Sequence, residues 1–302
     1  MISYLRHADI DLAAWDRRMA ACTNGSWYGL SATLEAAAPG WDALVDEATG
    51  AQMPLPWRMK YGIRYLYQPF LIQHLGPFSR EPGEDDAARF LHALPKRFRY
   101  ADIYMLGAAI SGSADLRTEE RTDHVLRLEG PVEALRAGYS LNHRRSLRKV
   151  EQLGVVVERG VGSGRVIDFL EGSEQFTRWG IDAVQRATMR RVLVASEETG
   201  TGFGRMVTGD GGPVAAAWFV RSGGSIIFLK GMASANGRDL RAMHALIDDV
   251  ISEHASSGML LDFAGGNDPQ LARFYSGFGA APVLYLRALM NRLPPLIRLM
   301  KP

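Results

Sequence analysis

The chain has 302 residues, of which 47% are hydrophobic and 23% charged, so it holds enough apolar material for a buried core and is neither disordered nor fibrous. Its 35 basic and 33 acidic residues leave a net charge of +2, so any basic surface must be local. Cys22 is the single cysteine, which excludes an intramolecular disulfide and a cysteine-rich metal site. None of the seven histidines forms an HxxxH pair, which argues against a zinc site.

The first half of the chain predicts a mixture of helices and strands. Helices are expected at 12–22 and 31–38, strands at 42–47, 52–60 and 63–72, a helix at 84–94, and further strands at 102–106 and 124–128. The strands around residues 52–72 are rich in aromatic and apolar side chains, which favours buried sheet.

The second half predicts a similar order of elements. A strand at 155–158 precedes helices at 166–179 and 183–196, and a three-stranded meander follows at 203–208, 213–220 and 225–232. A helix is expected from 239 to 255, a strand at 260–263, a helix that Asp268 and Pro269 begin, and a last strand at 282–289. The glycine-rich stretch at 200–212 matches neither a dinucleotide-binding motif nor a P-loop and is interpreted as a loop and a hairpin turn.

A duplicated element order predicts two α/β modules in tandem, each with a mostly antiparallel mixed sheet flanked by helices. Gly130 and Pro131 stop a strand before a helical stretch begins, so we place the modules at residues 1–135 and 136–302. The sequence has no signal-peptide pattern and no run of ~18 apolar residues. We therefore expect a soluble, cytoplasmic protein.

Several segments together resemble a known family. They are 54–69 (PLPWRMKYGIRYLYQP), 142–151 (NHRRSLRKVE), 237–243 (GRDLRAM) and 261–267 (LDFAGGN), the last continuing into 272–280 (ARFYSGFGA). The chain resembles the Fem-type branch of the GNAT acyltransferase superfamily, with two GNAT-like modules. The resemblance implies transfer of an acyl or aminoacyl group to an amine, as in Fem-type enzymes that take amino acids from aminoacyl-tRNA and add them to peptidoglycan precursors.

Two departures from the Fem-type pattern are visible. Leu261-Asp262-Phe263 is followed by Ala264-Gly265-Gly266 where relatives commonly have Glu-Gly-Ser, so a carboxylate that relatives offer is missing. The extended helical hairpin of some Fem enzymes is also not recognisable. Both departures leave the substrate open.

The resemblance implies that the donor substrate is either acyl-CoA or aminoacyl-tRNA, and that no further cofactor is required. GNAT enzymes hold the pyrophosphate of acyl-CoA with a glycine-rich loop between a strand and a helix, which corresponds here to residues 234–239. Gly237 fits the central glycine, but Ser234 and Asp239 depart from the pattern, and an aspartate would repel a pyrophosphate. The loop is therefore either a plain helix cap or an anion-binding loop.

A basic helix carries Arg144, Arg145, Arg148 and Lys149 within two turns. Such a run is either a solvated face or a clamp for the phosphates of a sugar nucleotide, a lipid diphosphate or tRNA. The phosphate clamp would use Arg144, Arg145 and Arg148.

Acyl transfer needs a neutral amine, a stabilised oxyanion and a proton for the leaving group. Lys230 ends an apolar strand and is a candidate for polarising a carbonyl or holding a phosphate, whereas Tyr275 is a candidate proton donor. Asp262 lies in an apolar strand and needs a partner, which makes Lys230 and Asp262 a candidate pair. Gln68, near several aromatic residues, is a candidate for an acceptor site between the modules.

Three functions stay open at this point. The first is a Fem-type acyl- or aminoacyltransferase, with a peptidoglycan or other cell-envelope precursor as acceptor. The second is an acyl-CoA-dependent N-acyltransferase of small molecules. The third is a non-catalytic, degenerate GNAT pair that binds a phosphate ligand or a protein.

The C-terminal segment suggests a peripheral membrane contact. Residues 283–302 contain no acid and mix basic with apolar side chains, among them Arg292, Arg298 and Lys301. Such a segment can lie in an anionic membrane interface, although Pro294 and Pro295 interrupt any helix. The expected behaviour is weak, salt-sensitive binding to anionic vesicles that truncation after Leu289 removes.

Overall fold

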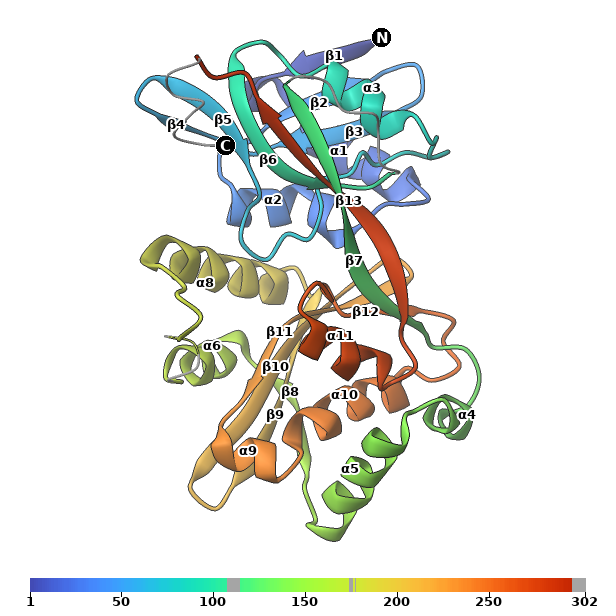
Figure 1. Cartoon of the computed structure of the whole chain (residues 1–302). Helices are drawn as coiled ribbons and strands as arrows, with labels where there is room; N and C mark the ends of the chain where they lie inside the picture. Colours follow the sequence, from blue (N-terminus) through green and yellow to red (C-terminus); the bar gives the residue numbers. More distant parts are fainter. Residues whose placement is uncertain (108–114, 174–175, 177, 295–302) are drawn as a thin grey trace. The chain divides into compact units, whose positions relative to one another are not determined.

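The computed structural model describes residues 1–107, 115–173, 176 and 178–294, and it divides into two compact units (Figure 1). Unit 1 comprises Met1–Arg121 and Leu284–Pro302, and unit 2 comprises Thr122–Val283. The chain thus leaves unit 1 at Arg121 and returns to it at Leu284, whereas the sequence suggested one change at residue 135. The predicted α/β class with mostly antiparallel sheet is confirmed.

Unit 1 combines two sheets with short helices. A small antiparallel sheet has the order β1-β2-β3, and a second set of strands has the order β4-β5-β6-β13, in which β5 and β6 run parallel. The elements are β1 (Ile2–Leu5), α1 (Leu12–Ala21), α2 (Ser31–Ala37), β2 (Asp42–Asp46), β3 (Ala51–Leu55), β4 (Trp57–Lys60), β5 (Ile63–Tyr67), α3 (Asp86–His92), β6 (Phe98–Met105) and β13 (Ala281–Asn291). Its core contains Trp15, Leu34, Trp41 and Phe78.

Unit 2 is built on strands in the order β7-β12-β11-β10-β9-β8, antiparallel except for the parallel pair β11 and β12. The elements are β7 (Leu116–Arg127), α4 (Val132–Ala137), α5 (Leu141–Gln152), β8 (Val157–Val161), α6 (Ser163–Glu171), α8 (Ala183–Glu198), β9 (Gly202–Gly209), β10 (Gly212–Ser222), β11 (Ser225–Ala233), α9 (Ala235–Asp239), α10 (Ala242–Glu253), β12 (Leu260–Asp262) and α11 (Pro269–Ser276).

Alternation along β10 explains how helices cover both faces of this sheet. The indole of Trp218 donates to the Ser196 hydroxyl of α8 at 2.9 Å, whereas Phe219 belongs to a core cluster with Leu246 and Ile247 of α10. Helices α6 and α8 therefore cover one face and α10 the other, as Figure 1 shows.

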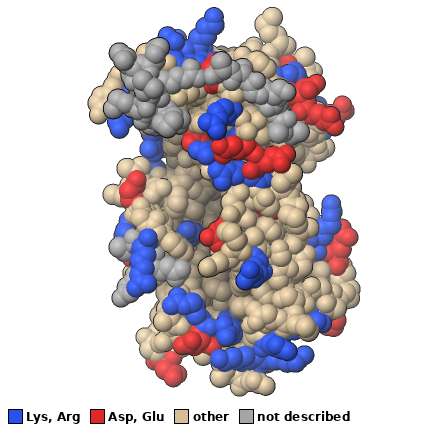
Figure 2. Space-filling model, in the orientation of Figure 1, with Lys and Arg blue, Asp and Glu red and all other residues tan. Residues whose placement is uncertain are grey.

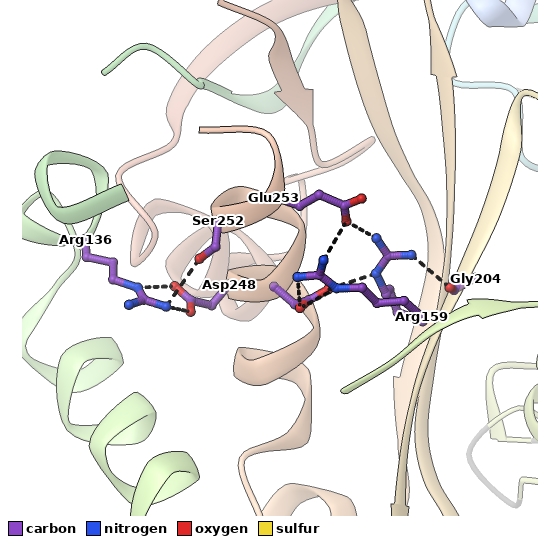
Figure 3. Close-up of polar contacts among 8 residues, drawn as sticks. Arg136, Arg159, Gly204, Asp248, Ser252 and Glu253 are labelled. Carbon is purple, nitrogen blue, oxygen red and sulfur yellow. Dashed lines mark hydrogen bonds and ion pairs between the residues drawn. The ribbon is translucent and has the colours of Figure 1, made fainter. Parts of the chain in front are cut away.

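Helix α10 is held by ion pairs on two flanks (Figure 3). Arg136 of α4 forms an ion pair with Asp248, in which Nε donates a hydrogen bond to Oδ1 at 3.0 Å. On the other flank, the buried Arg205 of β9 places Nε 2.8 Å from Asp249 Oδ2 and also pairs with Glu253. Because these pairs combine charge with directed hydrogen bonds, they fix the orientation of α10.

The expected helix at 239–255 begins later and is preceded by a separate short one. Ser234 caps α9 by accepting from the Gly237 amide at 3.2 Å, and α9 ends at Asp239. Arg241 then adopts a left-handed φ of 58°, and α10 starts at Ala242. The expectation that a helix starts at Asp239 is therefore wrong, because a left-handed residue cannot continue a right-handed helix.

Candidate functional site

Strands β11 and β12 pair over a short stretch and then separate. Their register runs from Ser225 opposite Leu260 to Ile227 opposite Asp262, where β12 ends. Strand β11 continues to Ala233 with β10 on its other side. Its last six residues thus have no strand beside them on the β12 side in the described part of the chain.

A pocket of about 710 Å³ lies along this free edge. Its walls come from β11, α9, α10, α11, the segment after β12 and the turn before α8. They include Trp179, Phe228, Lys230, Gly237, Arg238, Met243, His244, Phe263, Ala264, Asp268, Phe274 and Tyr275. Figure 2 shows the surface of unit 2 hollowed between α6 and α11. The volume suits a small-molecule group or one end of a larger substrate.

Lys230 enters this pocket from the face of the sheet that α6 and α8 cover. It lies opposite Trp218 in the β10–β11 register, next to an irregularity that leaves Leu229 without a counterpart on β10. Its ammonium lies 4.2 Å from the ring centroid of Trp179. Burial lowers the pKa of Lys230 to about 8, so both protonation states are accessible near neutral pH.

Tyr275 reaches the pocket from the opposite face. Its ring stacks on Phe263 with centroids 4.6 Å apart, and the side chain is buried. Burial raises the pKa of its phenol, and the nearby Asp123, Asp268 and Asp262 add to that effect. The phenol therefore keeps its proton at physiological pH and can donate it.

Asp262 has a different partner from the one suggested. Its carboxyl group shares a hydrogen bond with the Asp123 carboxyl of β7, and its Oδ1 accepts from the Ala264 amide at 2.6 Å. Asp123 Oδ1 accepts from the amides of His124 and Gly265, each at 2.7 Å. Burial and mutual repulsion raise the pKa of Asp123 to about 9.

Two carboxyl groups this close cannot both ionise, so the pair holds one proton at neutral pH. It sits against the pocket wall at Ala264, which has a left-handed φ of 52°. Sequence reasoning identified Asp262 as a carboxylate that needs a partner but missed Asp123, because the two residues are joined only by the pairing of β12 with β7.

Gly237 is explained by packing. A Cβ at this position would lie 2.2 Å from the Val214 carbonyl oxygen of β10. Its amide already donates to Ser234 Oγ. These contacts favour a helix cap over an anion-binding loop at residues 234–239, because the Gly237 amide is already occupied and is not available to a phosphate.

The basic helix α5 begins at a Ser140 cap and presents its cations outward. Arg145 and Arg148 are exposed, Arg144 is half-buried, and none of the three forms an ion pair with another described residue. The Nε of Arg144 is buried without a hydrogen-bond partner among the described atoms. Figure 2 shows basic side chains gathered over α5 and α9.

Gln68 lies in unit 1, where its amide group ties a loop to a strand. Nε2 donates to the Ile72 carbonyl at 2.6 Å, and Oε1 accepts from the Tyr104 amide at 2.8 Å. Both ends of the side chain are therefore occupied by structural hydrogen bonds.

A histidine pair that sequence reasoning missed joins α5 to α10. The rings of His143 and His244 lie 4.6 Å apart, and His143 Nε2 lies 2.9 Å from the Phe274 carbonyl of α11. Burial lowers the pKa of His244 to about 3, so His244 is neutral where it lines the pocket. No spacing signal could reveal this pair, because His143 and His244 come from distant segments.

Within the described ranges, no group of three or more His, Cys, Asp or Glu side chains could hold a metal ion. None of the described helices combines the length and hydrophobicity needed to cross a bilayer.

Residues 139–270 match the family model of the acetyltransferase (GNAT) domain, and most of the residues that line the pocket fall in this range. The whole chain is similar to the crystal structure of FemX, with a TM-score of 0.69 and 13% identity over 97% of this chain and 99% of that one. The resemblance to Fem-type GNAT proteins seen in the sequence is thus confirmed at the level of the fold.

Two further solved structures are similar in fold over nearly the whole chain. A tandem GNAT protein from the clavulanic acid biosynthesis pathway has a TM-score of 0.57 and 13% identity, covering 97% of this chain and 99% of that one. The C-terminal domain of a candidate lysylphosphatidylglycerol synthetase from Agrobacterium fabrum has a TM-score of 0.54 and 14% identity, covering 96% and 94%. Among curated proteins, none matches the chain.

Proposed function

We propose that the chain is a Fem-type acyl- or aminoacyltransferase that moves an acyl group from an activated donor to an amine. The observation that carries the proposal is the pocket of about 710 Å³ in the GNAT domain, into which Lys230 and Tyr275 project beside a free strand edge. Acyl transfer needs an oxyanion stabiliser and a proton donor at one carbonyl, and these groups supply both.

In the proposed reaction, a neutral amine of the acceptor attacks the donor carbonyl, and a C–N bond forms. Lys230 in its protonated form and the free N–H edge of β11 stabilise the oxyanion of the tetrahedral intermediate. The bond to the leaving group then breaks, and the Tyr275 phenol supplies the proton that the leaving group takes up. The proton lost by the attacking amine restores the phenol through solvent.

The proposed donor is aminoacyl-tRNA or acyl-CoA, and the proposed acceptor is a peptidoglycan or other cell-envelope precursor. The FemX-like fold over the whole chain supports an aminoacyl donor. The Ser234 cap and the tight packing at Gly237 speak against a pyrophosphate at residues 234–239. Arg144, Arg145 and Arg148 of α5 are proposed to hold a phosphate group of either substrate.

The test is transfer of a radiolabelled group from acetyl-CoA or from a mixture of aminoacyl-tRNAs to amine acceptors. Lys230→Met is expected to lower the transfer rate about a hundredfold, the size of a lost oxyanion contact. Lys96→Met, which changes an exposed lysine of unit 1, is the matched control. Transfer at the wild-type rate by the Lys230 variant would exclude the proposed site.

Binding and transfer assays also distinguish two alternative functions. Micromolar binding of acetyl-CoA in isothermal titration, with acetyl transfer to small amines, would identify a small-molecule N-acyltransferase. Binding of phosphate-bearing ligands without any transfer would identify a non-catalytic GNAT pair, which the missing carboxylate after Phe263 would explain.

A further inference from the structure

The β4–β5 hairpin of unit 1 is a basic, aromatic surface that the proposed transfer does not use. Between Trp57 and Tyr67 the chain has three cations, four aromatic rings and no acid. Strand β4 is at the end of its strand order, so one of its edges has no strand beside it among the described residues (Figure 1).

The register places cations and rings on the same face. Arg58 lies opposite Tyr65, and Lys60 lies opposite Ile63. Because side chains alternate along a strand, Arg58, Lys60, Tyr65 and Tyr67 share one face of the hairpin. The guanidinium of Arg58 lies 4.1 Å from the ring centroid of Tyr67, and the rings of Tyr65 and Tyr67 lie 6.5 Å apart.

The opposite face repeats this combination once, where Arg64 lies 4.7 Å from the ring centroid of Trp57. At the turn, Tyr61 is 91% exposed. The hairpin therefore offers flat rings and cations together on its surface.

The cations of the hairpin differ from those arginines that carboxylates hold in ion pairs. Arg89, Arg136, Arg205 and Arg287 all form ion pairs with carboxylates. By contrast, Arg58, Lys60 and Arg64 form none with any residue that the structure describes. Edge lysines can simply keep strands from associating, but that role does not need guanidinium groups stacked on rings.

We propose that this hairpin binds single-stranded RNA. Phosphates would lie against Arg58 and Lys60, and bases would stack on the exposed parts of Tyr65 and Tyr67. A lipid surface fits less well, because Ile63, the aliphatic side chain on the face shared by these residues, is half-buried. The proposal does not depend on the transferase site, since all of its residues lie in unit 1 and the pocket lies in unit 2.

The test is fluorescence anisotropy of a labelled single-stranded RNA of about ten nucleotides, titrated with the full chain at several salt concentrations. The double variant Arg58→Ala/Lys60→Ala should weaken binding about tenfold and reduce the salt slope by about 1.4, the value for two phosphate contacts. Tyr65→Leu should weaken binding about tenfold at every salt concentration, because stacking is not an ionic contact.

The matched control is Lys96→Ala/Arg99→Ala, which removes the same charge from exposed positions of unit 1 and should bind like wild type. Circular dichroism melts verify that each variant folds. The proposal is overturned if the wild type does not bind the RNA, or if the control weakens binding as much as the hairpin variant. Loss of binding to phosphatidylglycerol vesicles by the hairpin variants, with no RNA binding by wild type, would reassign the surface to lipid.

Discussion

At the residue scale, the site depends on groups whose pKa values differ from those of the free side chains. Burial shifts the pKa of Lys230, Tyr275 and Asp123 in the direction that stabilises the neutral form of each. A neutral state avoids the desolvation cost of an ion, and it leaves each group able to exchange or hold a proton. Lys230 and Asp123 give predictions whose pH dependence has a definite sign.

Lys230→Met should stabilise the protein at pH 7 by about 1 kcal/mol or more while it lowers transfer. The folded-state pKa is depressed from 10.5 to about 8, so between these values the unfolded chain binds more protons. The free energy of unfolding of the wild type therefore rises with pH from 8 to 10.5, and that of the variant does not. Urea denaturation at several pH values across this range measures the free energy of unfolding of both proteins. The same pH dependence in the wild type and the variant would contradict the prediction.

At a fixed concentration of neutral acceptor amine, the wild-type transfer rate should fall as pH rises through about 8, because the proposed carbonyl contact needs the charged form of Lys230. The measurement is kcat/KM between pH 6 and 10 with a donor whose own chemistry is constant over that range. A rate that keeps rising above pH 8 would assign Lys230 the role of a base instead.

Asp123→Asn should remove a pH-dependent loss of stability. The folded-state pKa of Asp123 is raised, so the folded protein binds more protons than the unfolded one above about pH 4, and the wild type loses stability as pH rises. An asparagine can still accept from the His124 and Gly265 amides and donate to Asp262. Thermal melts at pH 5 and 8 should show a smaller difference in Tm for the variant than for wild type.

At the element scale, the pocket exists because β12 is short. It pairs with β11 over three positions and ends at Asp262, so the rest of β11 borders an open space rather than a strand. Helix α10, held by ion pairs on both flanks, supplies the wall with Met243 and His244. The short helix α9 packs closely against β10 at Gly237.

Gly237→Ala should destabilise the protein by about 1–3 kcal/mol although alanine favours helices, because the new Cβ would meet the Val214 carbonyl. Gly211→Ala is the matched control, since a Cβ there has nothing within 4 Å. Chemical denaturation measures the free energy of unfolding of both variants. Equal values for Gly237→Ala and Gly211→Ala would contradict the prediction and would mean that α9 can move to make room for the Cβ.

Arg144→Ala/Arg148→Ala on α5 should leave the Tm near that of wild type and weaken an inorganic pyrophosphate or sugar-nucleotide ligand about tenfold. Both side chains lack ion pairs within the described part of the chain, so their removal costs little structure. Titration calorimetry compares the variant with Lys96→Ala/Arg99→Ala, and unchanged binding would make α5 a solvated face.

At the scale of the whole molecule, β13 changes how the C-terminus can be tested. The strand extends to Asn291, and Leu289 lies opposite Asp102 of β6, so truncation after Leu289 would damage unit 1. Arg298 and Lys301 of the suggested membrane segment lie outside the described residues. Truncation after Pro294 is the appropriate variant.

This truncation should abolish weak, salt-sensitive sedimentation with phosphatidylglycerol vesicles and leave the Tm unchanged. A lowered Tm, with no vesicle binding by the full chain, would instead make the segment structural and remove support for a lipid-linked acceptor.

The sequence by itself determined the class of most elements and the α/β class of the fold, and its resemblance to Fem-type proteins implied the tandem GNAT-like architecture. Alternating apolar residues, turn glycines and the Asp268–Pro269 helix start are local signals, and they placed most strands and α11 near their observed positions. Local signals also singled out Lys230, Tyr275 and Asp262 as unusual residues in apolar elements.

Only the tertiary structure decided which of these residues meet. Asp262 pairs with Asp123 because β12 lies beside β7, and Lys230 faces Trp179 because of its register on β11. The return of β13 to unit 1 and the packing of Gly237 against Val214 also depend on contacts between distant segments. Such contacts arise from the burial of whole elements, which spacing along the chain does not encode.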